Sequence, residues 1–514
     1  EIEKYGVAKF NKKCRESVFK YRDEWVEMSR RIGFWIDYDN AYITMEDYYI
    51  ESVWWALREI WKKGLLVKDY KVVPYCPRCG TPLSSHEVAQ GYRDAEDPSI
   101  YVKFKSKDGD FYFLVWTTTP WTLPSNLLLA VGKDIEYALV EYKREKYYVA
   151  KNLVKEIFGE DVKIEKVVMG EELVGLRYEQ LIPFVEVPPN ALRVVLGDFV
   201  STEEGTGIVH IAPAFGAEDY ELCKKENVPM VKPVDEEGKF METPWKGLFV
   251  KEADEKIIEY LEKEGKLFKK GRVVHTYPFC WRCDTPLLYY ALDTWFIKMS
   301  KLRDNLLRNN EEVNWYPSHL KYGRFGNFLD EVKDWALSRN RYWGTPLPIW
   351  ICKNGHVYIP ESKEDLLSRA ESVPEDFELH RPWVDELKIK CEECGEYMYR
   401  EPYLIDVWFD SGSAFFAQFH YPYENKEEFE RCFPVDFICE AIDQTRGWFY
   451  TLMAVSTLLF DKAPYKNVLT LGLVVDEKGE KMSKSRGNVV DAMEVMDCLL
   501  YTSDAADDGE RVDL

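Results

Sequence analysis

The sequence predicts an α/β fold in which a parallel-sheet domain is interrupted by a β-rich insertion and carries zinc-knuckle elements. A strand, helix, strand order lies toward the C-terminal end, and alternating apolar and polar residues fill the middle of the chain. Two nearly identical stretches, PYCPRCGTPL from Pro74 and PFCWRCDTPL from Pro278, bracket that middle block. Because the chain has 514 residues, of which 46% are hydrophobic, it can bury more than one core.

Each element of this prediction has its own pattern. Residues before about Leu66 have apolar positions at helical spacing, as in VAKFNKKCRESVFKYRDEWVEMSRRIG. In the block from about Ile100 to Arg272, apolar and polar residues alternate, as they do in β-strands, and turn residues separate the alternating segments. These segments are SIYVKFK, FYFLVWTT, YALVEY, KYYVAK and RVVLGDFV. The later segments VDFICEAID, TRGWFYTLMAVSTLLF and NVLTLGLVVD predict a parallel βαβ unit, whose ligands gather at the carboxyl ends of its strands.

Composition narrows the class of protein. The formal net charge of -22 disfavours broad electrostatic binding to nucleic acid, so a nucleic-acid partner has to be held by local basic patches. The sequence shows neither a long uncharged apolar run nor the order of a secretory signal, and we expect a cytoplasmic monomer. Many of the 12 cysteines occur in C-x-x-C pairs, which indicate metal ligands in a reducing compartment.

The repeated stretches predict one zinc site made from two halves. Cys76 and Cys79, like Cys280 and Cys283, have the spacing that lets two sulfurs face one ion. Each pair supplies only half of a tetrahedral site, so the four cysteines together are expected to join the entry and the exit of the inserted block. The alternative is two separate buried or redox-active pairs.

A second zinc site is predicted from a less regular pattern. Cys391 and Cys394 form another knuckle, and the upstream segment ICKNGHVY offers Cys352 and His356 as partners. Imidazole is a normal zinc ligand, which favours a site of three thiolates and one histidine; the alternative for His356 is a solvated loop histidine. We expect about two zinc ions, both structural, because no open position for water is evident.

The segment EKGEKMSKSRGN predicts a polyphosphate-binding loop. Its cations Lys481, Lys484 and Arg486 follow a predicted strand and can stabilise charge that develops on phosphate, although a Lys- and Ser-rich loop is by itself usually a solvated turn. KMSKS is the signature of class I aminoacyl-tRNA synthetases, and the chain resembles the isoleucyl-tRNA synthetases, especially those of the archaeal and eukaryotic type.

The resemblance extends from about Glu1 to Asp497. It rests on segments that include DVWFDSGSAFFAQFHYP, EAIDQTRGWFYTL, SRNRYWGTPLPIW, ELHRPWVDE and GTGIVHIAPAFGAEDY. It implies a Rossmann-type catalytic domain split by an inserted editing domain. It also implies ATP-dependent attachment of isoleucine to its tRNA(Ile) through isoleucyl-adenylate, with hydrolysis of mischarged valyl-tRNA and with Mg²⁺ accompanying the ATP.

The resemblance assigns roles in the synthetic site. Glu440 is expected to contact the adenylate and to act in catalysis together with Lys481 and Lys484. The ATP- and adenylate-binding residues it implies are Glu440, Asp443, Gln444, Gly472, Lys481, Ser483, Lys484 and Ser485. Trp408 and Trp448 are expected to form the wall of the isoleucine pocket, because flat apolar area suits a branched aliphatic side chain; their alternative role is core packing.

A second, hydrolytic site has a physical reason. A pocket that admits isoleucine cannot strongly exclude valine, since one methylene is worth only about 1 to 3 kcal/mol of discrimination. Thr117, Thr118, Thr119 and Asn126 are expected to orient a water and the ester. His210 is expected to hold the terminal adenosine and Asp219 the free amine. A structural His beside a Thr-rich strand is the alternative.

The predicted division of the chain has five parts. These are 1–99, part of the catalytic domain and connective region with the first knuckle; 100–277, the editing insertion; 278–434, the return knuckle, the second zinc insertion and a connective part; 435–497, the second half of the Rossmann domain; and 498–514, an artefactual tail.

Two departures from the family affect the expected activity. The sequence contains no His-x-Gly-His, the family's first ATP-binding signature, which is expected before Glu1. The family's helical anticodon-binding domain is likewise expected after Asp497. We therefore expect this chain to deacylate valyl-tRNA but not to activate isoleucine. A valyl- or leucyl-tRNA synthetase is an alternative within the class, and a zinc-ribbon protein that binds nucleic acid is an alternative outside it.

Overall fold

The computed structural model describes residues 2–34, 36–479, 482 and 487–499, which form two compact units. Unit 1 comprises residues 1–66, 298–334 and 341–514, and unit 2 comprises residues 67–297 and 335–340. Residues 100–277, predicted as an insertion, lie wholly within unit 2. Among the described residues, none of the helices is both long enough and apolar enough to cross a lipid bilayer.

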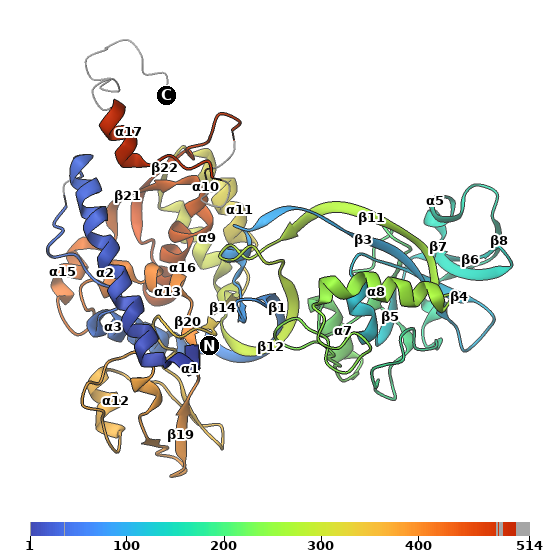
Figure 1. The fold of residues 1–514 in the computed structure, drawn as a ribbon, viewed down its shortest axis with the longest axis horizontal. Coiled ribbons are helices and arrows are strands. Elements are labelled where there is room, and N and C mark those ends of the chain that lie inside the picture. Colours follow the sequence, from blue (N-terminus) through green and yellow to red (C-terminus); the bar gives the residue numbers. More distant parts are fainter. Residues whose placement is uncertain (1, 35, 480–481, 483–486, 500–514) are drawn as a thin grey trace. The chain divides into compact units, whose positions relative to one another are not determined.

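Unit 1 contains a three-stranded parallel sheet in the order β13-β22-β21. Its strands are β13 (Asn314–Tyr316) and, labelled in Figure 1, β21 (Val435–Ala441) and β22 (Tyr465–Leu471). Helix α16 (Trp448–Phe460) connects β21 to β22, and its side chains from Phe449 to Leu458 are buried. The predicted parallel βαβ unit is therefore present, because an apolar helix returns the chain to a strand that pairs in the same direction.

The other helices of unit 1 include two long ones near the N-terminus, α2 (Val7–Arg31) and α3 (Asp47–Lys62). The remaining helical segments of this unit are α1 (Ile2–Tyr5), η3 (Met299–Leu302), α9 (Arg303–Glu311), α10 (His319–Tyr322), α11 (Arg324–Asp330), α12 (Lys363–Arg369), η4 (Trp383–Asp385), α13 (Val407–Gly412), α14 (Ala414–Ala417), α15 (Lys426–Cys432), η5 (Ile442–Arg446) and α17 (Ala492–Leu499).

A small antiparallel sheet of unit 1 carries the second cysteine group. Its strand order is β17-β16-β19-β18. The strands are β16 (Trp350–Cys352), β17 (Val357–Tyr358), β18 (Ile389–Lys390) and β19 (Tyr397–Arg400), and the short strand β20 (Leu404–Ile405) follows. The apolar residues beneath this sheet, including Trp54, Trp350 and Leu379, form one buried cluster.

Unit 2 is built mainly of β-strands. A six-stranded sheet runs β11-β3-β4-β7-β6-β8, a three-stranded sheet runs β10-β5-β9, and β12 pairs with β14 at the root of the unit. The strands are β1 (Leu66–Cys76), β2 (Thr81–Pro82), β3 (Tyr92–Lys105), β4 (Tyr112–Thr117), β5 (Leu128–Val131), β6 (Glu136–Tyr142), β7 (Glu145–Ala150), β8 (Lys163–Met169), β9 (Arg193–Leu196), β10 (Ile208–Ile211), β11 (Leu267–Pro278), β12 (Leu288–Ile297), β14 (Trp335–Ala336) and β15 (Ser338–Arg339).

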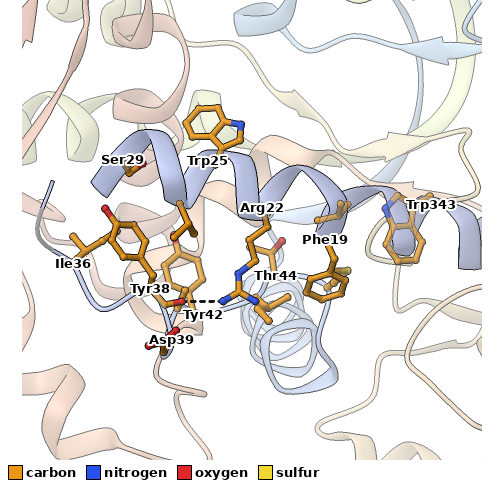
Figure 2. Close-up of a pocket in the computed structure, with 15 residues that line it drawn as sticks. Phe19, Arg22, Trp25, Ser29, Ile36, Tyr38, Asp39, Tyr42, Thr44 and Trp343 are labelled. Carbon is orange, nitrogen blue, oxygen red and sulfur yellow. Dashed lines mark hydrogen bonds between the residues drawn. The ribbon is translucent and has the colours of Figure 1, made fainter. Parts of the chain in front are cut away.

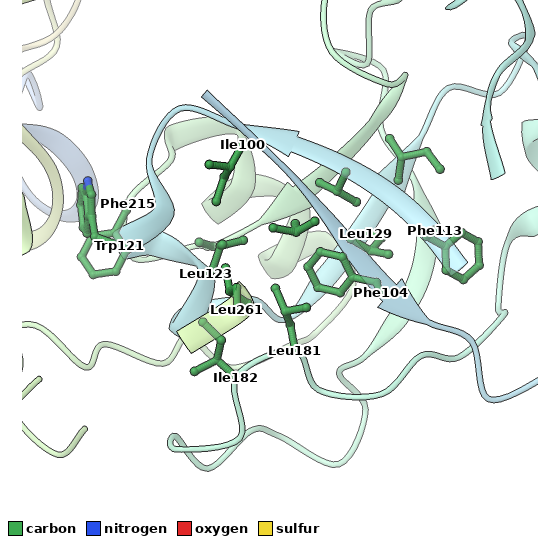
Figure 3. Packing of buried hydrophobic residues seen from close by; sticks show 14 of the residues in the cluster. Ile100, Phe104, Phe113, Trp121, Leu123, Leu129, Leu181, Ile182, Phe215 and Leu261 are labelled. Carbon is green, nitrogen blue, oxygen red and sulfur yellow. The ribbon is translucent and has the colours of Figure 1, made fainter. Parts of the chain in front are cut away.

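The helices of unit 2 cover these sheets. They are α4 (Ser85–Val88), η1 (Pro120–Ser125), η2 (Lys151–Leu153), α5 (Val154–Phe158), α6 (Gly170–Leu173), α7 (Ala217–Lys225) and α8 (Val250–Lys263). Apolar side chains from β3, η1, α8 and the segment after β10 pack into one cluster, in which Trp121 lies beside Phe215 (Figure 3). The alternation predicted from the sequence therefore places one face of β3 and β4 in a shared core.

Three segments differ from the sequence prediction. The strand predicted over RVVLGDFV ends at Leu196, and that over NVLTLGLVVD ends at Leu471, so both stop immediately before a glycine. The strand predicted over VDFICEAID ends at Ala441 and continues as the 3₁₀ turn η5. Glycine weakens a strand interior and has no side chain to pack, which explains the two early ends.

Candidate functional site

The four cysteines predicted to share a metal lie together within unit 2. One ligand atom from each of Cys76, Cys79, Cys280 and Cys283 falls within 4.8 Å of the other three. The Cys283 sulfur is 3.5 Å from both the Cys76 and the Cys79 sulfur. Four sulfurs around a tetrahedral zinc at about 2.3 Å would be about 3.8 Å apart, so the arrangement fits such an ion closely.

The two knuckles have the same local conformation, which the sequence repeat explains. The backbone N–H of Gly80 donates to the Cys76 carbonyl at 2.8 Å, and that of Asp284 donates to the Cys280 carbonyl at 2.9 Å. Both residues are left-handed, with φ of 63° at Gly80 and 57° at Asp284. Aspartate is one of the residues that tolerate this conformation, so CWRCD can form the same turn as CPRCG.

The second predicted group also comes together, in unit 1. The His356 Nδ1 atom is 3.5 Å from the Cys352 sulfur and 3.4 Å from the Cys391 sulfur, and the Cys394 and Cys352 sulfurs are 3.7 Å apart. His356 therefore faces the thiols instead of pointing into solvent. Hydrogen bonding from the Glu396 backbone lowers the pKa of Cys394 to about 6, which suits a thiolate ligand.

Two of the predicted adenylate-binding residues, Glu440 and Gly472, lie at the carboxyl edge of the parallel sheet of unit 1. Glu440 pairs with Thr470, and Ala441 pairs with Leu471 immediately before Gly472. Partial burial and the nearby Asp443 raise the pKa of Glu440. The structure therefore brings Glu440 and Gly472 to one edge of the sheet. Lys481, Ser483, Lys484 and Ser485 of the KMSKS segment lie outside the described residues.

The two predicted pocket tryptophans adjoin one turn of backbone. The Trp448 indole N–H donates to the Ser411 carbonyl at 2.9 Å, and the Trp448 backbone N–H donates to the Gln444 side chain at 2.9 Å. A Cβ at Gly447 would lie 3.1 Å from the Trp408 ring and 2.6 Å from the Gln444 side-chain oxygen. Only glycine fits there, and its absence of a side chain lets Trp408, Gln444 and Trp448 gather.

The Thr-rich segment of unit 2 forms a continuous chain of hydroxyl groups. The Thr117 and Thr119 oxygens are 3.3 Å apart, the Thr119 and Thr122 oxygens are 3.3 Å apart, and the Thr122 oxygen is 3.0 Å from His210 Nε2. The Thr122 hydroxyl donates to the Thr119 carbonyl at 2.9 Å. Thr122 was not among the predicted site residues. It could have been found from the sequence, because it is the fourth hydroxyl residue of the same segment, TTTPWT.

Proton counting fixes the form of His210. Because the single Thr122 proton is used on the Thr119 carbonyl, the Thr122 oxygen can only accept from His210, which must carry its proton on Nε2. The Nδ1 atom is then an acceptor, and it has no hydrogen-bond partner among the described residues. Burial lowers the pKa of His210 to about 4, so the ring is neutral near pH 7.

Asp219 lies close to this chain in sequence and structure. Its Oδ2 atom accepts the backbone N–H of Ala212 at 2.7 Å, two residues beyond His210. Burial raises the pKa of Asp219 to about 6, and Gly216 leaves room for the carboxylate, which would be 2.6 Å from a Cβ there. The carboxylate is therefore mostly ionised at pH 7.

Asn126 and Thr118 are placed differently. Asn126 is 3% exposed; its amide nitrogen donates to the Leu128 carbonyl at 3.0 Å and its oxygen accepts from the Tyr178 hydroxyl at 2.8 Å. Thr118 is half-buried between the two bonded threonines. Asn126 thus uses both ends of its amide within the core, where it shapes the end of η1.

A separate cavity of about 510 Å³ lies in unit 1 between α2 and residues 36–45 (Figure 2). Aromatic side chains, among them Phe19, Trp25 and Tyr42, line it, and Arg22 donates to the Tyr38 carbonyl at 3.0 Å. None of the predicted site residues lines this cavity.

Comparison with known proteins decides the family. The model of tRNA synthetases class I (I, L, M and V) matches residues 1–507. The chain belongs to this class I tRNA synthetase family. The predicted α/β fold class and the predicted membership in class I are thereby confirmed.

The most similar curated relatives of this synthetase chain include several named isoleucine–tRNA ligase. The chain is 55% identical over 500 residues to the isoleucine–tRNA ligase of Clostridium tetani, covering 97% of this chain and 48% of that protein. It is 56% identical over 499 residues to the isoleucine–tRNA ligase of Thermoplasma volcanium, covering 96% of this chain and 48% of that protein. The chain thus spans about half the length of the curated relatives it matches.

A solved structure was also found. The ternary complex of an Agrobacterium radiobacter LeuRS with tRNA and LeuAMS matches at 17% sequence identity and a TM-score of 0.41, covering 96% of this chain and 60% of that chain.

Proposed function

We propose that this chain carries the adenylate-binding half-site and the complete hydrolytic site of an isoleucine–tRNA ligase. The relatives named isoleucine–tRNA ligase support the amino acid and tRNA(Ile) as substrates, and ATP with Mg²⁺ as the source of the adenylate. The hydroxyl chain from Thr117 to His210 is the observation that carries the hydrolytic part, because one unit contains all of it.

The proposed hydrolysis releases a wrongly attached amino acid. Water adds to the ester carbonyl of valyl-tRNA(Ile), the bond from that carbon to the ribose oxygen breaks, and the ribose oxygen takes the proton. Thr119 and its hydroxyl neighbours orient the water, while the ionised Asp219 attracts the free ammonium group of valine. The neutral His210 would help to hold the terminal adenosine.

We also propose that both cysteine-rich groups hold Zn²⁺ in a structural role. The first, Cys76 with Cys79, Cys280 and Cys283, would join the two chain segments at the root of unit 2. The second would fix the small sheet of unit 1 through Cys352, His356, Cys391 and Cys394. Both donor sets are complete with four ligands, so neither leaves a position for a catalytic water.

Deacylation kinetics test this function. We expect the purified chain to hydrolyse valyl-tRNA(Ile) at least about tenfold faster than isoleucyl-tRNA(Ile), since an extra methylene excluded from a site is worth about 1 to 3 kcal/mol. Thr119→Ala should lower the rate on valyl-tRNA by about tenfold or more, by analogy with loss of one oriented polar group.

The matched control is Thr276→Ala, which removes an exposed hydroxyl from β11 and should leave the rate unchanged. Equal hydrolysis of both aminoacyl-tRNAs, or an unaltered rate in Thr119→Ala, would contradict the proposal. Preferential hydrolysis of a different mischarged tRNA would favour a valyl- or leucyl-type enzyme.

A further inference from the structure

The 3₁₀ turn η1 begins with an unusual donor arrangement. Its first residue, Pro120, has no backbone N–H, and the N–H of Thr122 is used on the Thr119 carbonyl at 3.0 Å. The backbone N–H of Trp121 is therefore the one donor at the start of η1 that the turn itself does not bond. Trp121 is only 3% exposed, so water does not readily replace the missing partner.

That partner comes from a distant helix of the same unit. The Oδ1 atom of Asp254, in α8, accepts the Trp121 N–H at 2.8 Å. Asp254 is 2% exposed, and Ile257 and Leu261 of the same helix are completely buried in the core that also contains Trp121. Figure 3 shows Leu261 and Trp121 among the residues of this core. The acceptor is therefore held on a rigid element.

The neighbours of Asp254 limit its other possible roles. Lys251, the nearby cation, is paired with Asp97 at 2.7 Å, and Asp97 also bonds His275 at 2.9 Å. Both the cation and the histidine are thus engaged by a different carboxylate. The hydrogen bond to Trp121 is the contact through which Asp254 reaches the Thr-rich segment.

We propose that Asp254 is a positioning residue for the hydrolytic site: by accepting the Trp121 N–H it fixes the register of η1 and so holds Thr122 against His210 and Thr119 beside Thr122. This inference rests on the proposed deacylase function. It assigns to Asp254 no contact with substrate. What matters is the place of its acceptor oxygen, whereas its negative charge is not required.

Two conservative substitutions separate the acceptor from the charge. Asp254→Asn keeps an oxygen at the same distance from the main chain and removes the charge, and we expect its kcat for valyl-tRNA deacylation to stay within about twofold of the parent. Asp254→Glu keeps the carboxyl group and moves its oxygens by one methylene. We expect its kcat to fall about tenfold or more with KM within about twofold, because displacements near 1 Å can cost up to about a hundredfold.

The matched control is Glu259→Asp, a change of one methylene at an exposed position of the same helix, which should leave kcat unchanged. Amide hydrogen exchange gives a second measurement. Comparing η1 with β3 and β11 of the same unit separates a local change in η1 from a change in the stability of the whole unit. Relative to the amides of β3 and β11, the amides of Trp121, Thr122, Leu123 and Ser125 should exchange faster in Asp254→Glu than in the parent, and at the parental rate in Asp254→Asn.

Either of two results would overturn the inference. One is an Asp254→Glu variant with parental kcat and exchange; the other is an Asp254→Asn variant as impaired as Asp254→Glu, which would make the charge decisive. If the parent chain itself does not hydrolyse valyl-tRNA, the proposed function fails. The exchange of residues 120–125 then still decides whether Asp254 fixes η1.

Discussion

The candidate sites of the two units differ in how their polar groups are satisfied. In unit 1, Glu440 and Gly472 are exposed at the edge of the parallel sheet. In unit 2, Thr117 and His210 are buried, and each is bonded within a chain of hydroxyl groups. The hydrolytic groups are thus arranged by contacts made within one unit, whereas the sheet edge offers separate groups to a ligand.

The difference follows from the local backbone. A parallel sheet ends with its strands side by side, so residues in the last paired positions, such as Glu440, can face solvent at the sheet edge. The 3₁₀ turn η1 instead folds its hydroxyls back toward their own backbone, where burial makes unbonded polar groups costly. We expect substitutions in unit 2 to disturb neighbouring groups, and those at the sheet edge to act locally.

The largest expected effect comes from breaking one cysteine group at a time. Metal analysis of the parent chain should give about two zinc ions, with one lost in either Cys280→Ser or Cys391→Ser. Cys280→Ser should destabilise unit 2 by several kcal/mol, because structural zinc contributes about 10 kcal/mol or more to small metal-dependent folds. Valyl-tRNA deacylation should disappear with it, while Cys391→Ser should retain this activity.

Cys432→Ser is the control, since Cys432 is exposed and belongs to neither group. If Cys391→Ser lost deacylation and Cys280→Ser kept it, the metal held by the cysteines of unit 2 would not be the one that supports the hydrolytic site. Three zinc ions in the parent would show that the knuckles of unit 2 bind metal separately.

A smaller effect is expected from a buried acid of unit 1. Burial and the nearby Asp406 raise the pKa of Asp410 to about 8. The folded protein therefore holds a proton that the unfolded chain has released between pH 4 and pH 8, so stability falls as pH rises through that window. Asp410→Asn removes this dependence.

Relative to the parent, Asp410→Asn should gain about 4 kcal/mol of unfolding free energy between pH 5 and pH 8, since one pKa unit corresponds to about 1.4 kcal/mol. Urea unfolding at the two pH values measures it, with Asp436→Asn as the control at an exposed carboxylate of the same unit. A gain that is the same at both pH values would mean that Asp410 is ionised in the folded protein across the range.

Short patterns predicted much of this molecule. C-x-x-C spacing identified six of the eight candidate metal ligands, because a knuckle is a local turn, and the remaining two, Cys352 and His356, were found four residues apart in ICKNGHVY. The βαβ order was visible because α16 is apolar along its length and its strands pair in parallel. The ends of β9 and β22 could not be predicted, because apolar residues continue beyond Leu196 and Leu471 after the strand pairing stops.

Contacts across long sequence separations could not be predicted in the same way. The bond between Asp254 and Trp121 joins residues 133 positions apart. The helical spacing of α8 places Asp254 on the apolar face with Val250 and Ile257, but it does not show which distant donor the carboxylate accepts. The internal use of both ends of Asn126 likewise depends on Tyr178, which lies in a different segment. Such pairs are set by packing, which a local pattern does not encode.

The smallest expected effect tests the link between Thr122 and His210. Thr122→Val removes the oxygen that accepts the Nε2 proton while nearly keeping the side-chain shape, so the proton is no longer fixed on Nε2. We expect deacylation of valyl-tRNA(Ile) to fall about fivefold, equivalent to about 1 kcal/mol and typical of one neutral hydrogen bond. Nitrogen chemical shifts of His210 should change from a single Nε2-protonated form to a mixture.

Thr122→Ser is the matched variant, because it keeps the hydroxyl and loses only a methyl group. Its rate should stay within about twofold of the parent, and its His210 shifts should be those of the Nε2-protonated form. If Thr122→Val also kept the parental tautomer and rate, the hydroxyl chain would end at Thr119 and His210 would be fixed by its buried surroundings alone. Unit 2 would then resemble unit 1, with each polar group acting separately on its ligand.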